Sequence, residues 1–283
     1  MRKLTSVVAV VVSLVGVGQA FAQSLPTVQP NYVQLTIEDV KVGHDGDHSK
    51  VEAGWPAAWE KAKSPYFGIG MVAVTGAPQA WFLTPFESNK AVGDSIKRNA
   101  DDPILAAELS RLMRADAAHI NGVRTLLLSA RKDLSRGAFP DAGRQRFYEV
   151  TMFRVRPGHE DQFTAAGKAY SEAAGRLAPN ANYRVYEVAA GMPSPAYLVI
   201  SSVVAFADFD KSFSEGEATM KGMTKEEQAT LQKFSAEGLI NVETQRFRLD
   251  PNMCYVPKEV RAQDPAFWMP KKPVMKAPST QEP

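Results

Sequence analysis

The body of this chain contains the same pattern of landmark residues twice. The matched pairs, each 115 positions apart, are Gly43-His44 with Gly158-His159, Val40 with Val155, Trp55 with Tyr170, and Gly76 with Gly191. One copy alone is short for a stable domain, because small domains bury a low fraction of their surface. We therefore expect two copies that bury one surface against each other, which constrains the architecture and leaves the chemistry open.

Each copy predicts the order strand, helix, strand, strand, helix, strand, which is the ferredoxin-like arrangement. Residues 32–40 alternate apolar and polar side chains, as a half-buried strand does, and residues 147–155 repeat this pattern. Ser49 and Glu52 have capping-box spacing for the first helix. Pro56 predicts a kink or a restart inside that helix.

The predicted domain boundaries follow from the repeat. They are a signal peptide at 1–22, repeat one at 30–130, a linker at 131–146, repeat two at 147–257, and a proline-rich, largely irregular tail at 258–283. In the first segment, Arg2-Lys3 precedes an apolar run from Val7 to Val17, and Ala20-Phe21-Ala22 is typical of a cleavage site. Cleavage between Ala22 and Gln23 predicts a periplasmic or secreted protein without a stable membrane span.

Charge and cysteine content exclude several classes of protein. Removing Arg2 and Lys3 leaves 31 basic residues against 31 acidic ones, so a nucleic-acid partner is not indicated. The single cysteine, Cys254, has apolar neighbours and is interpreted as a small buried residue. No phosphate-binding loop, dinucleotide-binding glycine fingerprint or Cys-x-x-Cys pair occurs, so we predict no cofactor.

Two stretches of the chain resemble the dimeric α+β barrel superfamily. These are the turn Pro157-Gly158-His159-Glu160-Asp161-Gln162-Phe163 before an amphipathic helix, and Phe206-Ala207-Asp208-Phe209 after a strand. The superfamily includes antibiotic-biosynthesis-type monooxygenases, NIPSNAP-like proteins and haem-degrading enzymes. The resemblance covers about 30–130 and 146–256, and it implies that the two copies close one barrel within a single chain. The Asn, Trp and His set of the haem-degrading members does not map onto either copy.

The first strand of each copy suggests which side chains line a pocket. Val33, Leu35 and Ile37 share one side, which we expect to face the helices. The other side is then predicted to face a partly polar barrel interior and to bind a ligand between the sheets. Its residues are Gln34, Thr36, Glu38, Glu149, Thr151 and Phe153.

Glu149 and His119 are the candidate catalytic residues. A buried carboxylate needs a partner or a shifted pKa, so Glu149 is either a base or the partner of Arg184 or Arg246. His119 either favours a helix C-terminus or reaches the pocket mouth. His44, His48 and His159 are assigned to an exposed turn, and no metal site is predicted there.

Three functions remain open at this point. The first is an exported barrel, monomeric or homodimeric, that binds a small apolar or aromatic molecule. The second is a cofactor-independent monooxygenase-like enzyme, which the resemblance implies. The third is a structural or interaction protein of the cell envelope that docks through its proline-rich tail.

Overall fold

The structure is a computed structural model that describes residues 25–269 of the 283-residue chain. The predicted signal peptide at 1–22 and the last part of the tail lie outside the described residues. Among the helices that are described, none is long and apolar enough to cross a membrane.

The first half of the chain has strands that match the predicted alternation and helices that partly do not. Its elements are β1 Tyr32–Val40, α1 Asp45–Glu52, α2 Gly54–Lys61, β2 Ile69–Ala73, β3 Gln79–Phe86, α3 Asn89–Asp101, α4 Pro103–Asp116 and β4 Ile120–Ala130. The predicted capping box of Ser49 and Glu52 is wrong, because α1 already begins at Asp45 and His44 is its N-cap. The restart near Pro56 is confirmed, since α2 begins at Gly54.

The second half follows with a single long helix where the first half has α1 and α2. Its elements are β5 Phe147–Val155, α5 Glu160–Leu177, β6 Arg184–Ala190, β7 Ala196–Val203, α6 Asp208–Lys221, α7 Lys225–Lys233, a π-helical turn at Phe234–Gly238 and β8 Leu239–Leu249. Gly43 and Gly158 precede the first helix of each half with φ of 83° and 87°. Glycine adopts this left-handed conformation without steric cost, which explains its recurrence at the turn.

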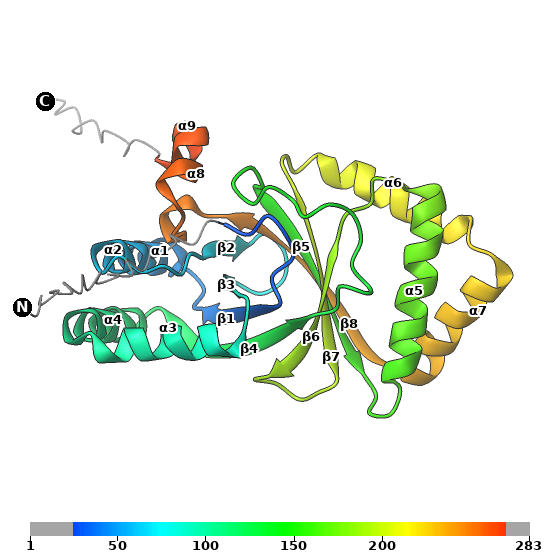
Figure 1. Ribbon diagram of the computed structural model, residues 1–283, viewed down its shortest axis with the longest axis horizontal. Coiled ribbons are helices and arrows are strands. Elements are labelled where there is room, and N and C mark those ends of the chain that lie inside the picture. Colours follow the sequence, from blue (N-terminus) through cyan, green and yellow to red (C-terminus); the bar gives the residue numbers. More distant parts are fainter. Residues whose placement is uncertain (1–24, 270–283) are drawn as a thin grey trace, which may run out of the picture.

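In residues 25–269, eight strands close into one antiparallel barrel in the order β1-β3-β2-β8-β5-β7-β6-β4. Four strands from each half lie side by side, and two seams join the halves. At one seam Met71 of β2 pairs with Leu249 of β8, and at the other Leu128 of β4 pairs with Val188 of β6. The helices lie outside the barrel, with α1 to α4 on one flank and α5 to α7 on the other (Figure 1).

The barrel interior is a packed apolar core. It includes Leu35, Val150, Leu198 and Phe247, each no more than 2% exposed, and every one of the eight strands contributes at least one residue. The prediction that Val33, Leu35 and Ile37 face the helices is therefore wrong, because these side chains point inward. A closed barrel excludes water from its interior, so the apolar side of β1 faces inward and its more polar side, with Gln34 and Thr36, faces outward.

A consequence is that little space remains between the two sheets. The cavity at one end of the barrel, beside Tyr148 and Tyr186, has a volume of about 100 Å³. That volume is below the range typical of small-molecule pockets. The ligand site that the sequence predicts between the sheets is therefore not the cavity of about 710 Å³ described in the next subsection.

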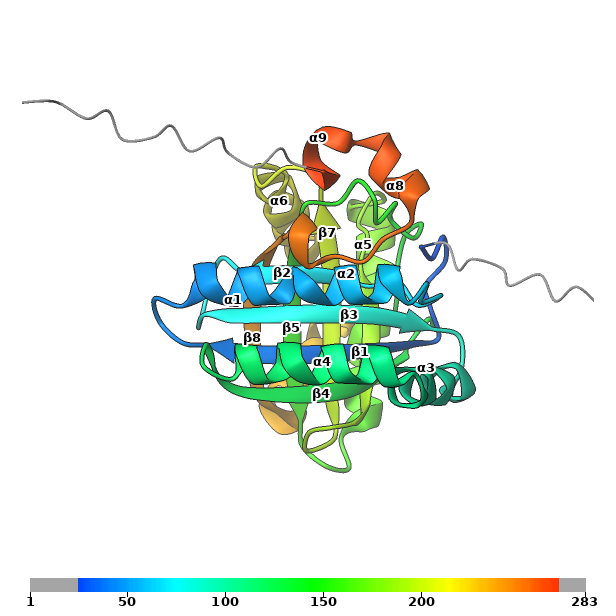
Figure 2. The same cartoon turned by 90° about the vertical axis from the view of Figure 1, so that its left-hand side faces the viewer.

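The helices of the two flanks pack in different ways. Viewed face-on, α2 runs in front of β2 and α4 runs in front of β1, with β3 visible between the two helices (Figure 2). They contact each other through Ala58, Leu109 and Leu112. On the other flank, Phe163 of α5 stacks on Tyr197 of β7 with ring centroids 3.9 Å apart. On this flank α5 therefore packs directly against the sheet of the second half.

Residues 250–269 cover one end of the barrel. They form a 3₁₀ turn at Pro251–Met253 and the short helices α8 Lys258–Gln263 and α9 Pro265–Trp268, which the sequence did not lead us to expect. Trp268 is 5% exposed, and its Nε1 donates to the carbonyl of Gly143 at 3.1 Å. Arg146 binds Asp264 at 2.6 Å. This segment is therefore fixed to the barrel as far as residue 269.

Candidate functional site

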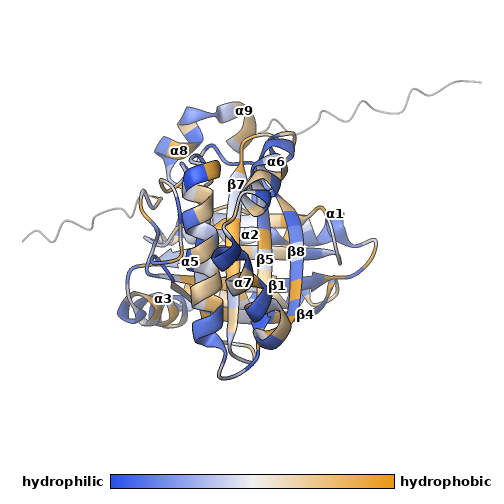
Figure 3. Ribbon diagram, turned by 90° about the vertical axis from the view of Figure 1, so that its right-hand side faces the viewer, coloured by the Kyte–Doolittle hydropathy of each residue, from blue (hydrophilic) through white to orange (hydrophobic). Residues whose placement is uncertain are grey.

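A cavity of about 710 Å³, here called the α5–α7 cavity, lies between the sheet of the second half and the helices α5, α6 and α7. Its floor is the outer side of β5 and β7, and its walls come from α5, α6 and α7. Figure 3 shows this flank, with α5 and α7 in front of the sheet. The lining residues used below are Glu149, Thr151, Phe153, Phe163, Tyr170, Tyr183, Val199, Asp208, Lys211, Gly216 and Leu231.

One wall of the α5–α7 cavity is aromatic. Tyr170 of α5 and Tyr183, just before β6, lie with ring centroids 6.1 Å apart. Phe153 and Phe163 continue the wall, with centroids 5.6 Å apart. Burial raises the pKa of both tyrosines, so each phenol keeps its proton and can donate a hydrogen bond.

The floor carries a few polar groups. Glu149 Oε2 accepts a hydrogen bond from Arg246 Nε at 2.7 Å, which selects Arg246 from the two predicted partners. Thr151 and Thr244 are joined through their hydroxyls at 2.9 Å. On the wall formed by α6, Lys211 lies 3.8 Å from Glu215 on the next turn. An apolar wall with a few fixed polar groups is the usual composition of a small-molecule pocket.

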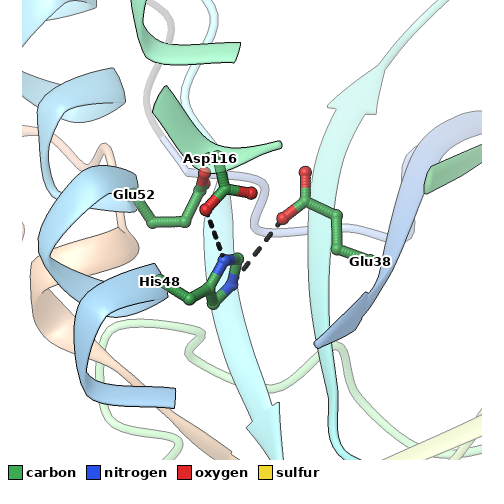
Figure 4. Close-up of side chains that lie close together, drawn as sticks. All are labelled: Glu38, His48, Glu52 and Asp116. Atoms are coloured by element: carbon green, nitrogen blue, oxygen red, sulfur yellow. Dashed lines mark hydrogen bonds and ion pairs between the residues drawn. The ribbon is translucent and has the colours of Figure 1, made fainter. Parts of the chain in front are cut away.

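A second polar site lies in the first half, between β1 and the helices α1 and α4. It consists of Glu38, His48, Glu52 and Asp116, here called the His48 cluster, whose side chains converge as Figure 4 shows. His48 Nδ1 lies 2.9 Å from Asp116 Oδ1, and His48 Nε2 lies 3.7 Å from Glu38 Oε2. All four residues are buried, with His48 only 1% exposed.

Burial dominates the electrostatics of the His48 cluster. Desolvation, followed by the neighbouring carboxylates of Glu38 and Asp116, raises the pKa of Glu52 to about 9. Desolvation also raises the pKa of Glu38 to about 7, with His48 acting in the opposite direction. Low-dielectric surroundings disfavour the charged form of a carboxyl group, which accounts for both directions.

His119 and His44 form a pair beside this cluster. Their Nδ1 atoms lie 3.0 Å apart, and one of the rings must donate while the other accepts. His44 is the N-cap of α1, and the backbone N–H of His119 donates to the carbonyl of Asp116. His119 therefore lies on the opposite flank from the α5–α7 cavity.

The structure separates the residues that the sequence grouped together. Glu149, Thr151 and Phe153 line the α5–α7 cavity, whereas Gln34 and Thr36 lie on the outer side of the other sheet. Glu38 belongs to the His48 cluster. No observation tests whether any of the six binds a ligand, and that part stays a prediction.

Sequence reasoning missed the His48 cluster because it placed His48 on an exposed turn. His48 and Glu52 are four residues apart, so they share one side of any helix that spans them. That spacing was the available signal. Only the fold, however, brings Glu38 and Asp116 from distant parts of the chain to the same point.

Comparison with known proteins identifies the fold of this chain and does not identify its activity. No known protein family matches the sequence, and no curated protein matches it either. Among solved structures, one named "putative monooxygenase" from Lactobacillus acidophilus has a TM-score of 0.50 at 7% identity, covering 81% of this chain and 97% of that one. A second of the same name, from Fusobacterium nucleatum, has a TM-score of 0.50 at 8% identity, with coverages of 78% and 93%.

A chlorite dismutase variant from Candidatus Nitrospira defluvii is also similar, with a TM-score of 0.48 at 10% identity and coverages of 83% and 96%. What the geometry and the comparisons establish together is that this chain has the closed α+β barrel fold of the monooxygenase-like structures.

Proposed function

We propose that this protein binds a small, largely apolar or aromatic molecule in the α5–α7 cavity. The observation that carries the proposal is a cavity of about 710 Å³ with a wall of four aromatic rings. Pockets of roughly 300–1,000 Å³ bury most of the surface of a drug-sized ligand. The phenols of Tyr170 and Tyr183 and the Glu149–Arg246 pair supply the polar contacts that would orient the ligand.

A cavity-filling substitution tests this proposal. A Cβ built at Gly216 has only the Tyr170 hydroxyl, 4.0 Å away, as a neighbour, so Gly216→Leu projects into the cavity without a backbone clash. We expect the variant to bind naphthol and anilinonaphthalene sulfonate (ANS) at least about tenfold more weakly, measured by fluorescence titration, because the volume they need is filled. Equal dissociation constants for the variant and the wild type would contradict the proposal.

Gly93 provides the matched control for this experiment. It lies on helix α3 of the other half, and a Cβ there meets nothing within 4 Å. Gly93→Leu and Gly216→Leu gain similar helix propensity, about 1 kcal/mol each. Only the second is expected to change ligand affinity.

A second candidate function is oxidation of the bound molecule without a cofactor. Two structures of the same fold carry the name monooxygenase, and Glu149 lies on the cavity floor. A phenol that loses its proton to Glu149 would be oxidised by molecular oxygen. One oxygen atom enters the ring as a carbonyl, and the other leaves as water with the two hydrogens lost from the phenol. Oxygen uptake with naphthol that disappears in Glu149→Gln would support this function, and absence of uptake in the wild type would exclude naphthol oxidation.

We infer further that the two halves are copies of one ferredoxin-like unit fused in tandem. β1 and β5 begin 115 residues apart, and the pair Thr36–Thr125 of the first sheet corresponds to Thr151–Thr244 of the second. A homologous chain with one unit that forms the same barrel as a homodimer would support this inference. Homologues whose two halves align with different families would refute it.

We also propose that the chain is exported with removal of residues 1–22. The support is the sequence itself, with Arg2-Lys3, the apolar run Val7–Val17 and the small residues at Ala20 and Ala22. Amino-terminal sequencing of the protein from a periplasmic or culture fraction is expected to begin at Gln23. An intact Met1 terminus on the cellular protein would contradict export by cleavage.

A further inference from the structure

The His48 cluster gathers four metal-ligating side chains from three separate elements. Glu38 comes from β1, His48 and Glu52 come from α1, and Asp116 ends α4. One nitrogen or oxygen atom of each lies within 4.8 Å of those of the others. A distance of this size is what ligands on opposite sides of one ion require, since metal–ligand bonds are about 2.0–2.2 Å long.

Each of the four side chains has a buried polar atom without a hydrogen-bond partner. These atoms are Glu38 Oε2, His48 Nε2, Glu52 Oε1 and Asp116 Oδ2. Glu52 and Asp116 are 4% and 2% exposed, so water does not satisfy them from the surface. Leaving a buried polar atom unpaired costs about 1–3 kcal/mol, and more when it is charged. Four such atoms in one cluster, whose potential ligand atoms lie within 4.8 Å of one another, indicate that something polar normally occupies the space between them.

No basic side chain supplies the missing positive charge. Within residues 25–269, no lysine or arginine forms an ion pair with any member of the cluster. The groups that act on Glu38 and Glu52 are the other members of the cluster and the indole of Trp55. A cation is therefore the occupant that would compensate three buried carboxyl groups.

The orientation of His48 fits a metal ligand. Asp116 engages Nδ1 at 2.9 Å, which fixes the ring, and Nε2 points toward Glu38 at a distance too long for a good hydrogen bond. Carboxylate, histidine and metal in this order form the usual arrangement in which the carboxylate orients the ring. Glu52 lies on the same side of α1 as His48, one turn further on.

We propose that the His48 cluster binds one divalent first-row transition-metal ion. His48 Nε2, Glu38 and Glu52 are its ligands, and Asp116 is a positioning residue that holds the ring of His48. Mixed imidazole and carboxylate donors suit Zn²⁺, Mn²⁺ or Fe²⁺ better than Mg²⁺ or Ca²⁺, which prefer oxygen donors alone. Because the site is buried, the ion joins β1 to α1 and α4 and does not open to a substrate.

Metal loading of the full chain tests the proposal. Protein stripped with a chelator is dialysed against Zn²⁺, Mn²⁺ or Co²⁺ alone, and bound metal is measured by plasma mass spectrometry. We expect one ion per chain, a raised unfolding temperature and, for Co²⁺, visible absorption bands from a protein-ligated site. Less than about one tenth of an ion per chain for every metal would overturn the proposal.

Conservative variants identify the ligands. Glu52→Gln keeps the shape of the side chain and is expected to remove the Co²⁺ bands. Asp116→Asn is expected to weaken binding about 10–100-fold, as loss of a ligand-orienting carboxylate does. Circular dichroism of the metal-free variants verifies that they are folded. Unchanged affinity in folded Glu52→Gln would overturn the assignment.

His44→Ala separates this site from the neighbouring histidine pair. The side chain of His44 contacts the ring of His119, and within residues 25–269 it forms no hydrogen bond or ion pair with the four cluster side chains. Its backbone carbonyl accepts from the N–H of His48, a contact that His44→Ala keeps. We expect His44→Ala to retain one ion per chain. Loss of the ion in His44→Ala would place the metal on the His44–His119 pair and overturn the proposal.

Discussion

Arg246 Nε donates to Glu149 Oε2 at 2.7 Å, and the same guanidinium lies 4.3 Å from the centre of the Phe209 ring. The pair joins β8 to β5 and reaches α6 through the cation–π contact. Its side chains are 32% and 27% exposed, so the ion pair contributes little to stability. Its main effect is to set the charge on the floor of the α5–α7 cavity.

Glu149→Gln removes one negative charge from that floor and leaves Arg246 unpaired. We expect ANS, an anion, to bind about 3–10-fold more tightly to the variant, because charges a few ångströms apart at a partly exposed site interact by about 1 kcal/mol. Fluorescence titration at two salt concentrations checks this result, and the gain is expected to shrink at high salt.

Glu60→Gln is the control for this charge effect. Glu60 pairs with Arg261 on the other flank, outside the cavity. Its substitution is expected to leave ANS affinity unchanged. An equal gain in both variants would show that net charge, and not the cavity floor, controls the affinity.

Leu35→Ala tests the inward orientation of β1. Leu35 is fully buried in the barrel core, so we expect a loss of about 2–5 kcal/mol in the free energy of unfolding. Urea denaturation followed by circular dichroism measures it. Val123→Ala, at a position on β4 that is 59% exposed, is expected to change this free energy by less than about 0.5 kcal/mol. Similar losses in the two variants would contradict the barrel assignment.

Glu52→Gln changes how the stability of the chelator-treated protein depends on pH. The pKa of Glu52 rises from 4.5 to about 9 on burial, so the unfolded chain loses this proton before the folded chain does. The associated stability is complete below pH 4.5 and is lost as pH rises toward 9, by at most about 1.4 kcal/mol per pH unit.

The variant has no proton to lose at this position. We therefore expect the free energy of unfolding of the wild type, measured by urea denaturation, to fall more steeply between pH 5.5 and 8 than that of Glu52→Gln, by about 1 kcal/mol per pH unit or less. Glu226→Gln, at an exposed position on α7, is expected to follow the wild type. Parallel pH curves for the wild type and Glu52→Gln would contradict the raised pKa.

Cys254 is expected to be unreactive in the folded protein. Burial raises the pKa of its thiol to about 12, and Sγ contacts the carbonyl of Asp250 at 3.1 Å. Because only the thiolate attacks, modification by a disulfide reagent at pH 8 is expected to be at least about a hundredfold slower than in urea. Equal rates in native and unfolded protein would show that the thiol is exposed.

Local sequence patterns located the strands well but did not predict the helices α3, α8 and α9. The predicted strands 32–40 and 147–155 have the same bounds as β1 and β5. In contrast, α3 was not predicted, because Val92 and Ile96 are its only large apolar residues, and none of its residues is buried. The segment 258–268 was also expected to be irregular. It forms two helices of six and four residues, which are too short to give a periodic apolar pattern in the sequence.

Alternation alone does not tell which side of a strand faces the core of a barrel. Val33 and Leu35 were correctly placed on the same side of β1. Whether that side faces the barrel interior or the helices depends on the tertiary structure, which alternation does not encode. The His48 cluster illustrates a stronger limit. Glu38 and Asp116 are 78 positions apart, and only the packing of α4 beside β1 brings them together.

The seams of the barrel constrain how a newly made chain can fold. β2 is complete at Ala73, but its partner β8 begins only at Leu239. Until then, one edge of β2 presents unpaired backbone N–H and C=O groups beside an uncovered apolar surface. Open edges of this kind pair readily with other chains and lead to aggregation. We therefore expect a nascent chain of this protein to carry an open β2 edge while residues 74–238, more than half of its length, are being made.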